Sequence, residues 1–322
     1  MKRISRITQT ATVLGVALAL LTAGCGGGGG SSSGGSSGGG GSEAAKDKLD
    51  GASLTVGSKE FTESKVLGQI TMAVLENAGA KVKEASLSGS ATVREALVKG
   101  ELDMYWEYTG TGWVNILKNT TEKVPKDLYA QVAKADKEKN KIAWLKPAPM
   151  NDTYRIAAKE DFATKNSIKT MSDAAKFVSG KPAEGKVCAA SEFINRDDGL
   201  PGVEKAYGFK FSEVVELDLG LVYTQVGQKC NFGEVFSTDG RIVANKLVNL
   251  DDDKKFFVDY NAALTMRQET LDKYPAIAEL MAPISKALTS EEITALNAKV
   301  DVDGETEEDV AQKWLKEKNL LG

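Results

Sequence analysis

The stretch Leu102-Asp-Met-Tyr-Trp-Glu-Tyr-Thr-Gly-Thr-Gly112 has the composition of a β-strand that ends in a glycine-rich turn. Its first seven residues have the apolar and aromatic bias of a strand. The Thr-Gly-Thr-Gly that follows predicts a turn whose glycines let the backbone approach a ligand closely. Such an ending places Tyr108 at the carboxyl edge of a sheet, where open α/β sheets bind their ligands. Tyr108 is therefore the first candidate for a ligand-binding residue.

Strand and helix patterns alternate before this stretch and again well after it. In the order strand, helix, strand, helix, strand, the expected elements are residues 54–58, 61–78, 81–87, 91–99 and 102–108. This alternation is typical of a parallel sheet with right-handed crossovers. A second block of the same kind runs from a strand at 186–190 to a strand at 232–236.

Two segments with an extended pattern, 151–157 and 256–266, separate the blocks. They predict that the chain leaves the first block and later returns to it. We therefore expect an α/β fold with two lobes, joined by two crossing strands with a ligand cleft between them. Lobe 1 would comprise residues 47–150 and 262–322, and lobe 2 residues 151–261.

The N-terminus has the features of an export signal. Residues 1–24 combine Lys2, Arg3 and Arg6 with a short apolar run, as a signal peptide does. Thr22-Ala-Gly-Cys25 is similar to a bacterial lipobox, with threonine where leucine is usual. We expect cleavage before Cys25 and a lipid on its sulfur, and a plain secretory leader is the alternative.

Residues 25–46 would then form a tether, because positions 26–42 contain only glycine and serine. The predicted location is the extracytoplasmic face of the cell membrane, either in a periplasm or at the cell surface. No apolar run of the length of a membrane-spanning helix follows the N-terminal segment.

Composition excludes several classes of function. The chain has no histidine, which removes the usual general base and the commonest metal ligand. Outside the Gly/Ser-only segment 26–42 it also lacks a Gly-x-Ser-x-Gly elbow, and it has no cluster with metal-ligand spacing, so we expect neither an enzyme nor a cofactor. The formal net charge of −4 and the lack of a basic block argue against nucleic acid as a partner. We expect a monomer.

Two cysteines remain besides Cys25. In an exported protein, an isolated pair such as Cys188 and Cys230 predicts a disulfide, which would close a loop of about forty residues. Two buried free thiols are the alternative.

Four short stretches together identify a family. They are Gly57-Ser-Lys-Glu-Phe-Thr-Glu63, Glu107-Tyr-Thr-Gly-Thr111, Glu192-Phe-Ile-Asn-Arg-Asp-Asp-Gly199 and Phe236-Ser-Thr-Asp-Gly-Arg-Ile242. This set resembles the substrate-binding proteins of osmoprotectant ABC importers, the glycine betaine/carnitine/choline-binding family. The resemblance covers nearly all of the chain from about Leu54 onward, in family order. It implies the bilobal fold of periplasmic binding proteins, and an ABC permease in the cytoplasmic membrane as partner.

The resemblance also implies a ligand site for a quaternary ammonium compound. An aromatic box around the ammonium head would consist of Tyr108, Tyr154, Phe236 and Tyr260. Phe236 departs from the family pattern, which commonly has tyrosine there. A trimethylammonium group has no N–H to donate, so it is held by aromatic faces, at roughly 0.5–2 kcal/mol for each well-placed ring.

Three further polar positions, and Thr111, follow from the same resemblance. Lys59 and Arg196 match the residues that meet the ligand's carboxylate, and Asp152 matches a polar position beside the ammonium group. Choline-restricted members tend to have an acidic residue where Thr111 stands. The two cations and Thr111 thus favour a betaine over choline.

Less specific interpretations remain open at this point. Arg196 could instead pair with the neighbouring Asp197 or Asp198, and the rings could be ordinary packing. The protein could then bind choline or an amino acid, or be a surface lipoprotein without a ligand.

Overall fold

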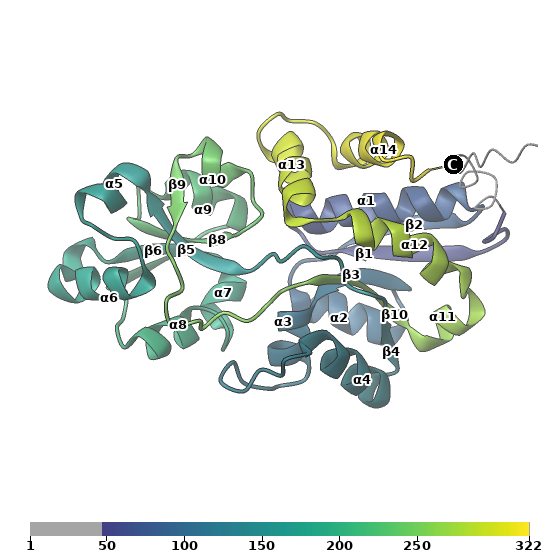
Figure 1. The fold of residues 1–322 in the computed structure, drawn as a ribbon, viewed down its shortest axis with the longest axis horizontal. Coiled ribbons are helices and arrows are strands. Elements are labelled where there is room, and N and C mark those ends of the chain that lie inside the picture. The colour runs from purple at the N-terminus through teal and green to yellow at the C-terminus, as the bar shows by residue number, and fades with distance from the viewer. Residues whose placement is uncertain (1–46, 322) are drawn as a thin grey trace, which may run out of the picture. The chain divides into compact units, whose positions relative to one another are not determined.

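The computed structural model describes residues 47–321. The predicted signal peptide, Cys25 and the rest of the predicted tether lie outside these residues. Within them the chain forms two separate five-stranded mixed sheets, each covered by helices (Figure 1). We call each sheet with its helices a lobe. This confirms the predicted α/β class and two-lobed architecture. Among the described helices, none has both the length and the apolar character needed to cross a membrane.

The first lobe is built on a sheet with the strand order β2-β1-β3-β10-β4. Its strands are β1 (Ser53–Ser58), β2 (Lys81–Ser86), β3 (Met104–Tyr108), β4 (Ile142–Trp144) and β10 (Ala262–Arg267). The β1 strand pairs in parallel with β2 and β3, as predicted, whereas β10 is antiparallel to both β3 and β4. The central β3 is buried at all five positions because it has a strand on either side and helices on both faces.

Among residues 47–321, nine helical segments belong to this lobe. They are α1 (Thr62–Asn77), α2 (Ser90–Lys99), α3 (Thr109–Thr111), the π-helical η1 (Gly112–Ile116), α4 (Leu128–Asn140), α11 (Gln268–Lys273), α12 (Ala276–Ala287), α13 (Ser290–Asp301) and α14 (Glu307–Glu317). The apolar residues of α1 recur at helical spacing and are buried, Val66 and Ile70 completely. Figure 1 shows α1 and α2 on opposite sides of β1 and β3.

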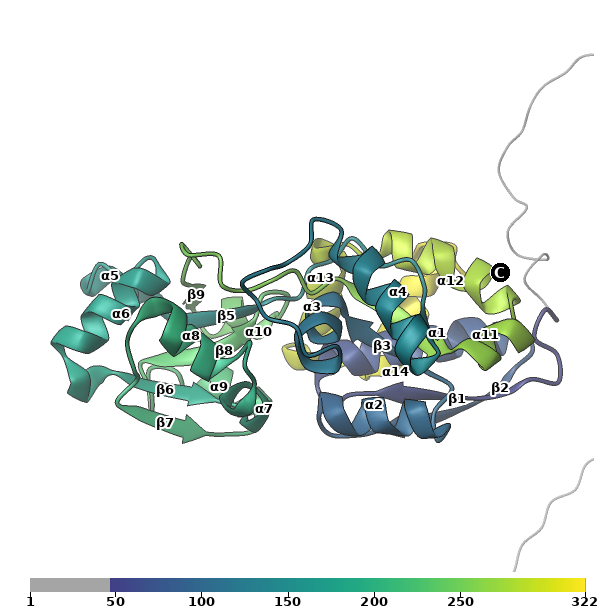
Figure 2. The same cartoon turned by 90° about the horizontal axis from the view of Figure 1, so that it is seen from below.

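The second lobe has the strand order β7-β6-β8-β5-β9. Its strands are β5 (Tyr154–Lys159), β6 (Lys186–Ala189), β7 (Glu213–Glu216), β8 (Phe232–Phe236) and β9 (Leu247–Asn249). Its helices are α5 (Glu160–Lys165), α6 (Met171–Gly180), the 3-10 segment η2 (Pro182–Glu184), α7 (Ser191–Asn195), α8 (Leu200–Tyr207), α9 (Leu219–Gln225) and α10 (Arg241–Ala244). Figures 1 and 2 both place α5 and α6 at the end of this lobe that lies away from the first.

The chain crosses between the sheets twice, between β4 and β5 and between β9 and β10. The crossing segments are irregular rather than strands, since β5 begins only at Tyr154 and β10 at Ala262. They run side by side and hydrogen-bond to each other. The Asp152 N–H donates to the Tyr260 carbonyl over 3.1 Å, and the Tyr260 N–H donates to Asn151 Oδ1 over 2.8 Å.

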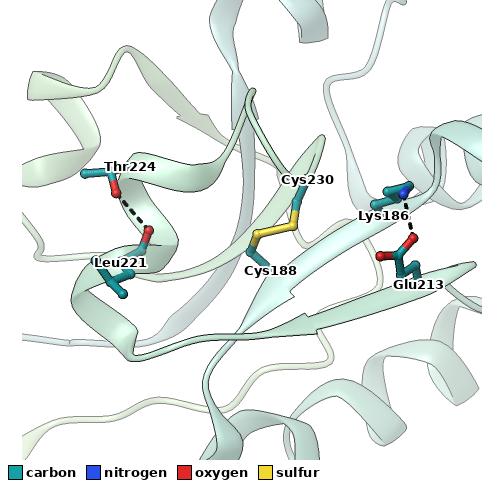
Figure 3. The surroundings of a disulfide bond; sticks show 6 residues. All are labelled: Lys186, Cys188, Glu213, Leu221, Thr224 and Cys230. Carbon is teal, nitrogen blue, oxygen red and sulfur yellow. Dashed lines mark hydrogen bonds and ion pairs between the residues drawn. A yellow bond between two sulfur atoms is a disulfide. The ribbon is translucent and has the colours of Figure 1, made fainter.

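A disulfide joins Cys188 in β6 to Cys230, two residues before β8 (Figure 3). The Cα atoms are 5.6 Å apart and both residues are buried in a small core of their own with Val222, Tyr223 and Val226. The predicted pairing is confirmed. The disulfide cross-links two adjacent strands of the second lobe. In each case the cysteine precedes residues that line the cleft.

Candidate functional site

A cavity of about 50 Å³ lies between the lobes, large enough for several water molecules. All eight residues that the sequence analysis nominated line it: Lys59, Tyr108, Thr111, Asp152, Tyr154, Arg196, Phe236 and Tyr260. The sequence analysis did not nominate the other lining residues, Glu60, Phe61, Ser90, Ala190, Glu192, Leu219 and Glu234. A larger groove of about 1580 Å³, bordered by both lobes, shares several of these residues.

Strand pairing brings the aromatic rings together. Tyr154 and Phe236 are direct cross-strand partners in β5 and β8, with ring centroids 4.9 Å apart. Tyr260, in the returning crossing segment, packs edge-on against Tyr154 at 5.5 Å. Tyr108 is contributed by the end of β3 in the first lobe.

A further ring, Phe61, stands with this box. It directly precedes α1, and its centroid is 5.3 Å from that of Phe236 and 6.1 Å from that of Tyr108. Phe61 therefore bridges rings of the two lobes. It lies inside the quoted stretch that contains Lys59, but the sequence gives no sign of the direction in which it points.

The glycines after Tyr108 serve a purpose other than the predicted one. Residues 109–116 continue as helix, not as a turn. A Cβ atom on Gly110 would lie 2.5 Å from Cε1 of Tyr260, so this glycine makes room for a ring of the box. Gly112 similarly accommodates the ring of Trp144. The close approach that the sequence assigned to a ligand is made by aromatic side chains.

Lys59 is paired with an acid. Its Nζ lies 2.7 Å from Oε1 of Glu107, with both side chains buried, and 5.2 Å from the ring centroid of Tyr108. Glu107 also accepts hydrogen bonds from the Tyr105 hydroxyl and the Tyr108 N–H, both over 2.8 Å. The positive charge of Lys59 is thus balanced within the first lobe.

Arg196 is paired as well, and its partner is the Asp198 that the sequence left as an alternative. Its Nε and Nη2 donate to the two carboxylate oxygens of Asp198 over 2.8 and 2.7 Å. Nη1 donates to Glu192 over 2.6 Å, and Nη2 also reaches Thr111 Oγ1 at 3.3 Å. Of the five guanidinium N–H groups, one on Nη1 has no acceptor among residues 47–321. The guanidinium also lies over the Tyr154 ring, 5.4 Å from its centroid.

Two buried acids, Glu63 of α1 and Asp152 of the first crossing segment, flank the hydroxyl of Thr238. Oγ1 of Thr238 is 2.6 Å from Oε2 of Glu63 and 2.6 Å from Oδ1 of Asp152. Tyr108 donates its hydroxyl to the other oxygen of Glu63 over 2.8 Å. Burial raises the pKa of both acids, and the charge of Glu63 raises that of Asp152 further. Because one hydroxyl carries only one proton, the two short contacts favour a second proton on one of the acids.

Most of the unpredicted polar partners lie inside the four quoted stretches. Glu63, Glu107, Glu192, Asp198 and Thr238 all do so. Glu234 does not. It precedes Phe236 by two positions on β8, so strand alternation puts it on the same face, and that spacing was the signal available in the sequence.

Comparison with known proteins agrees with this architecture. Residues 52–317 match the family described as the substrate-binding domain of ABC-type glycine betaine transport systems. The glycine betaine-binding protein YehZ of Escherichia coli is 36% identical over 275 residues, which cover 82% of this chain and 90% of YehZ. A glycine-betaine-binding protein of Pseudomonas aeruginosa is 35% identical over 278 residues, covering 84% and 89% of the two chains.

A solved structure extends the likeness to three dimensions. Unliganded YehZ from Escherichia coli superposes with a TM-score of 0.61 at 34% identity, over 83% of this chain and 99% of that one. The sequence match and the fold together place the protein among binding proteins rather than enzymes. The chain belongs to the family of substrate-binding domains of ABC-type glycine betaine transport systems.

Proposed function

We propose that the protein is the extracytoplasmic receptor of an ABC importer and closes around a quaternary ammonium solute of the betaine type. The observation that carries this proposal is the convergence of five rings on one cavity: Phe61, Tyr108, Tyr154, Phe236 and Tyr260. Aromatic faces from two lobes attract a cation that cannot donate an N–H hydrogen bond. Asp152, at the same cavity, adds a carboxyl group beside the ammonium head.

The ligand's carboxylate would face Arg196, whose remaining Nη1–H is available for it, with Lys59 as the second cation. Both cations already have acidic partners, so they recognise a carboxylate chiefly by hydrogen bonding and not by net charge. Thr111 contacts Arg196 and would orient it. This arrangement supports a betaine over choline.

Closure would occur by a hinge in the paired crossing segments. We propose residues 47–150 and 262–322 as lobe 1 and residues 151–261 as lobe 2. The closed form would then dock on a membrane permease. Cys25 would carry the lipid that holds the monomeric receptor to the outer face of the cytoplasmic membrane, and the Gly/Ser-rich tether would let it reach the permease.

Thermal unfolding in the presence of a ligand panel tests the proposal. Glycine betaine at a hundred times its Kd stabilises by about 2.7 kcal/mol and raises Tm measurably. Carnitine, choline and amino acids complete the panel. In Tyr108→Ala the betaine shift should disappear, whereas in the control Tyr274→Ala, a tyrosine outside the cavity, it should persist. A shift with amino acids alone would discard the aromatic box, and no shift with any compound would discard the receptor.

A further inference from the structure

Glu234 is a buried acid that faces the proposed ligand without a counterion of its own. It lies on β8, is 2% exposed, and lines the cavity. Its Oε2 accepts a hydrogen bond from the Ala190 N–H over 2.7 Å. No residue among 47–321 donates a hydrogen bond to its Oε1. This oxygen is not among the unpartnered side-chain atoms that are fully buried, so part of its surface is accessible. Oε1 therefore opens onto the cavity.

The groups around Glu234 leave it no cation to itself. Arg196 is the cation near Glu234, and it already forms ion pairs with Asp198 and Glu192. Lys59 is bound by Glu107. The remaining titratable neighbour on an adjoining strand is Tyr154 of β5, whereas Ala190, after β6, and Leu219 of α9 do not titrate. Burial, and then the charge of Glu192, raise the pKa of Glu234 to about 8, against the opposing effects of the Ala190 N–H and Arg196.

A betaine's carboxylate beside Arg196 would enter a region that already holds the carboxylates of Glu192 and Asp198. An ionised Glu234 would add a third negative charge at close range and repel it. A protonated Glu234 would instead donate a hydrogen bond from the cavity-facing oxygen. Hydrogen bonds between a carboxyl O–H and a carboxylate are short and strong because one partner is charged.

We propose that Glu234 is a specificity-determining residue: it binds in its protonated form, donates its O–H to the carboxylate of a betaine, and so couples zwitterion binding to one proton. This inference rests on the proposed function and adds how the site tells betaines from choline. Choline has a hydroxyl in place of the carboxylate, so it does not require the proton. In this way the site selects a zwitterion although its own two cations, Lys59 and Arg196, are already paired with acids.

Titration calorimetry across pH tests the inference on the full mature protein. The protonated fraction of Glu234 falls from most molecules at pH 7 to about one in a hundred at pH 10, so the Kd for glycine betaine should rise by about 100-fold. The Kd for choline should not rise with it. At pH 9, calorimetry in buffers of different ionisation enthalpy should show uptake of close to one proton per betaine bound.

Glu234→Gln separates this role from a structural one, because the amide fits the same space and always carries a donor. At pH 7 its glycine betaine Kd should stay within about threefold of the wild-type value. The rise toward pH 10 and the proton uptake should both be lost. Glu101→Gln, which changes an exposed carboxylate outside the cavity, should retain both. Unchanged circular dichroism and Tm exclude misfolding of either variant.

Three results would overturn the inference: a betaine affinity independent of pH in the wild type, the same pH dependence in Glu234→Gln, or no proton uptake at pH 9. Failure of the proposed function looks different, because the wild type would then bind neither glycine betaine nor choline at any pH.

Discussion

The carboxylate of Glu192 in the second lobe holds Ser90 in the first. Its Oε1 accepts the Ser90 hydroxyl over 2.7 Å and its Oε2 accepts the Ser90 N–H over 3.0 Å, at the first turn of α2. Burial works against ionisation of this group, but the charges of Lys59 and Arg196 and the Ser90 hydrogen bonds lower the pKa of Glu192 to about 2. The Glu192 carboxylate therefore stays ionised at physiological pH, and its contact with Ser90 links the lobes at the rim of the cavity.

Ser90→Ala should weaken ligand binding. Removing the hydroxyl deletes one of the three hydrogen-bond donors to the Glu192 carboxylate, and such bonds contribute about 1.5–3 kcal/mol. Because the contact joins the lobes, we expect the loss to appear as a rise of about 10- to 140-fold in the Kd for glycine betaine. Calorimetry measures it. Ser86→Ala, an exposed serine on β2, is the matched control. Equal Kd values for the two variants would show that the contact does not contribute to closure.

Phe61→Ala should raise the Kd for quaternary ammonium ligands by about 2- to 30-fold, the worth of one cation–π contact. Phe61→Leu keeps most of the apolar volume but removes the π face. If the ring acts on the cation, both variants lose affinity. If it acts only by packing, Phe61→Leu should bind nearly as well as the wild type in calorimetric titrations, and the cation–π role would be wrong.

The sequence predicted the elements that carry a clear hydrophobic period. The alternation through β1, α1, β2, α2 and β3 was predicted to within a few residues, because each element has enough turns or alternations to show its period. The strands β4 and β9 were not predicted, because three residues are too few to alternate. The helix α6 was also missed, although Thr170 and Asp173 form the capping box that marks its start.

The candidate site could be predicted by residue, but its ion pairs only in part. The eight nominated residues line one cavity: five belong to the quoted stretches, whereas Asp152 and Tyr260 lie in the crossing segments and Tyr154 begins β5. That Glu107 neutralises Lys59 depends on side-chain packing between the ends of β1 and β3, and no local pattern encodes it. Asp198, the partner of Arg196, is only two residues away in sequence and was one of the stated alternatives. Likewise, the reason for Gly110 lies in its contact with the ring of Tyr260, which is 150 residues away in sequence (260 − 110).

Replacing both Cys188 and Cys230 with alanine should destabilise the protein by about 4 kcal/mol, the chain-entropy value for a loop of this length. Urea unfolding monitored by circular dichroism measures the difference. Dithiothreitol should destabilise the wild type and leave the double variant unchanged, which serves as the control. Because the bridge lies behind the cleft-lining ends of β6 and β8, affinity for glycine betaine should fall as well. Equal stability with and without the bridge would contradict its structural role.

Asp152→Asn should stabilise the unliganded protein at neutral pH while weakening ligand binding. Burial and the charge of Glu63 raise the pKa of Asp152, so the folded state binds its proton more tightly than the unfolded state. A raised carboxyl pKa means that stability falls as pH increases from the unfolded pKa toward the folded one. Asparagine carries no charge and can still accept the Thr238 hydroxyl, so it avoids that loss.

The Tm of Asp152→Asn should therefore exceed that of the wild type at pH 7, and the difference should shrink toward about pH 3, below the unfolded-state pKa of about 3.9, where wild-type Asp152 is mostly protonated in both states. Its Kd for glycine betaine should rise because the ammonium head loses a nearby carboxyl group. Asp161→Asn, an exposed acid at the first turn of α5, controls for a general charge effect. If Asp152→Asn lowered Tm at pH 7, the ionised Asp152 would be stabilised in the folded protein. The inference that Glu63 and Asp152 hold an extra proton beside Thr238 would then be wrong.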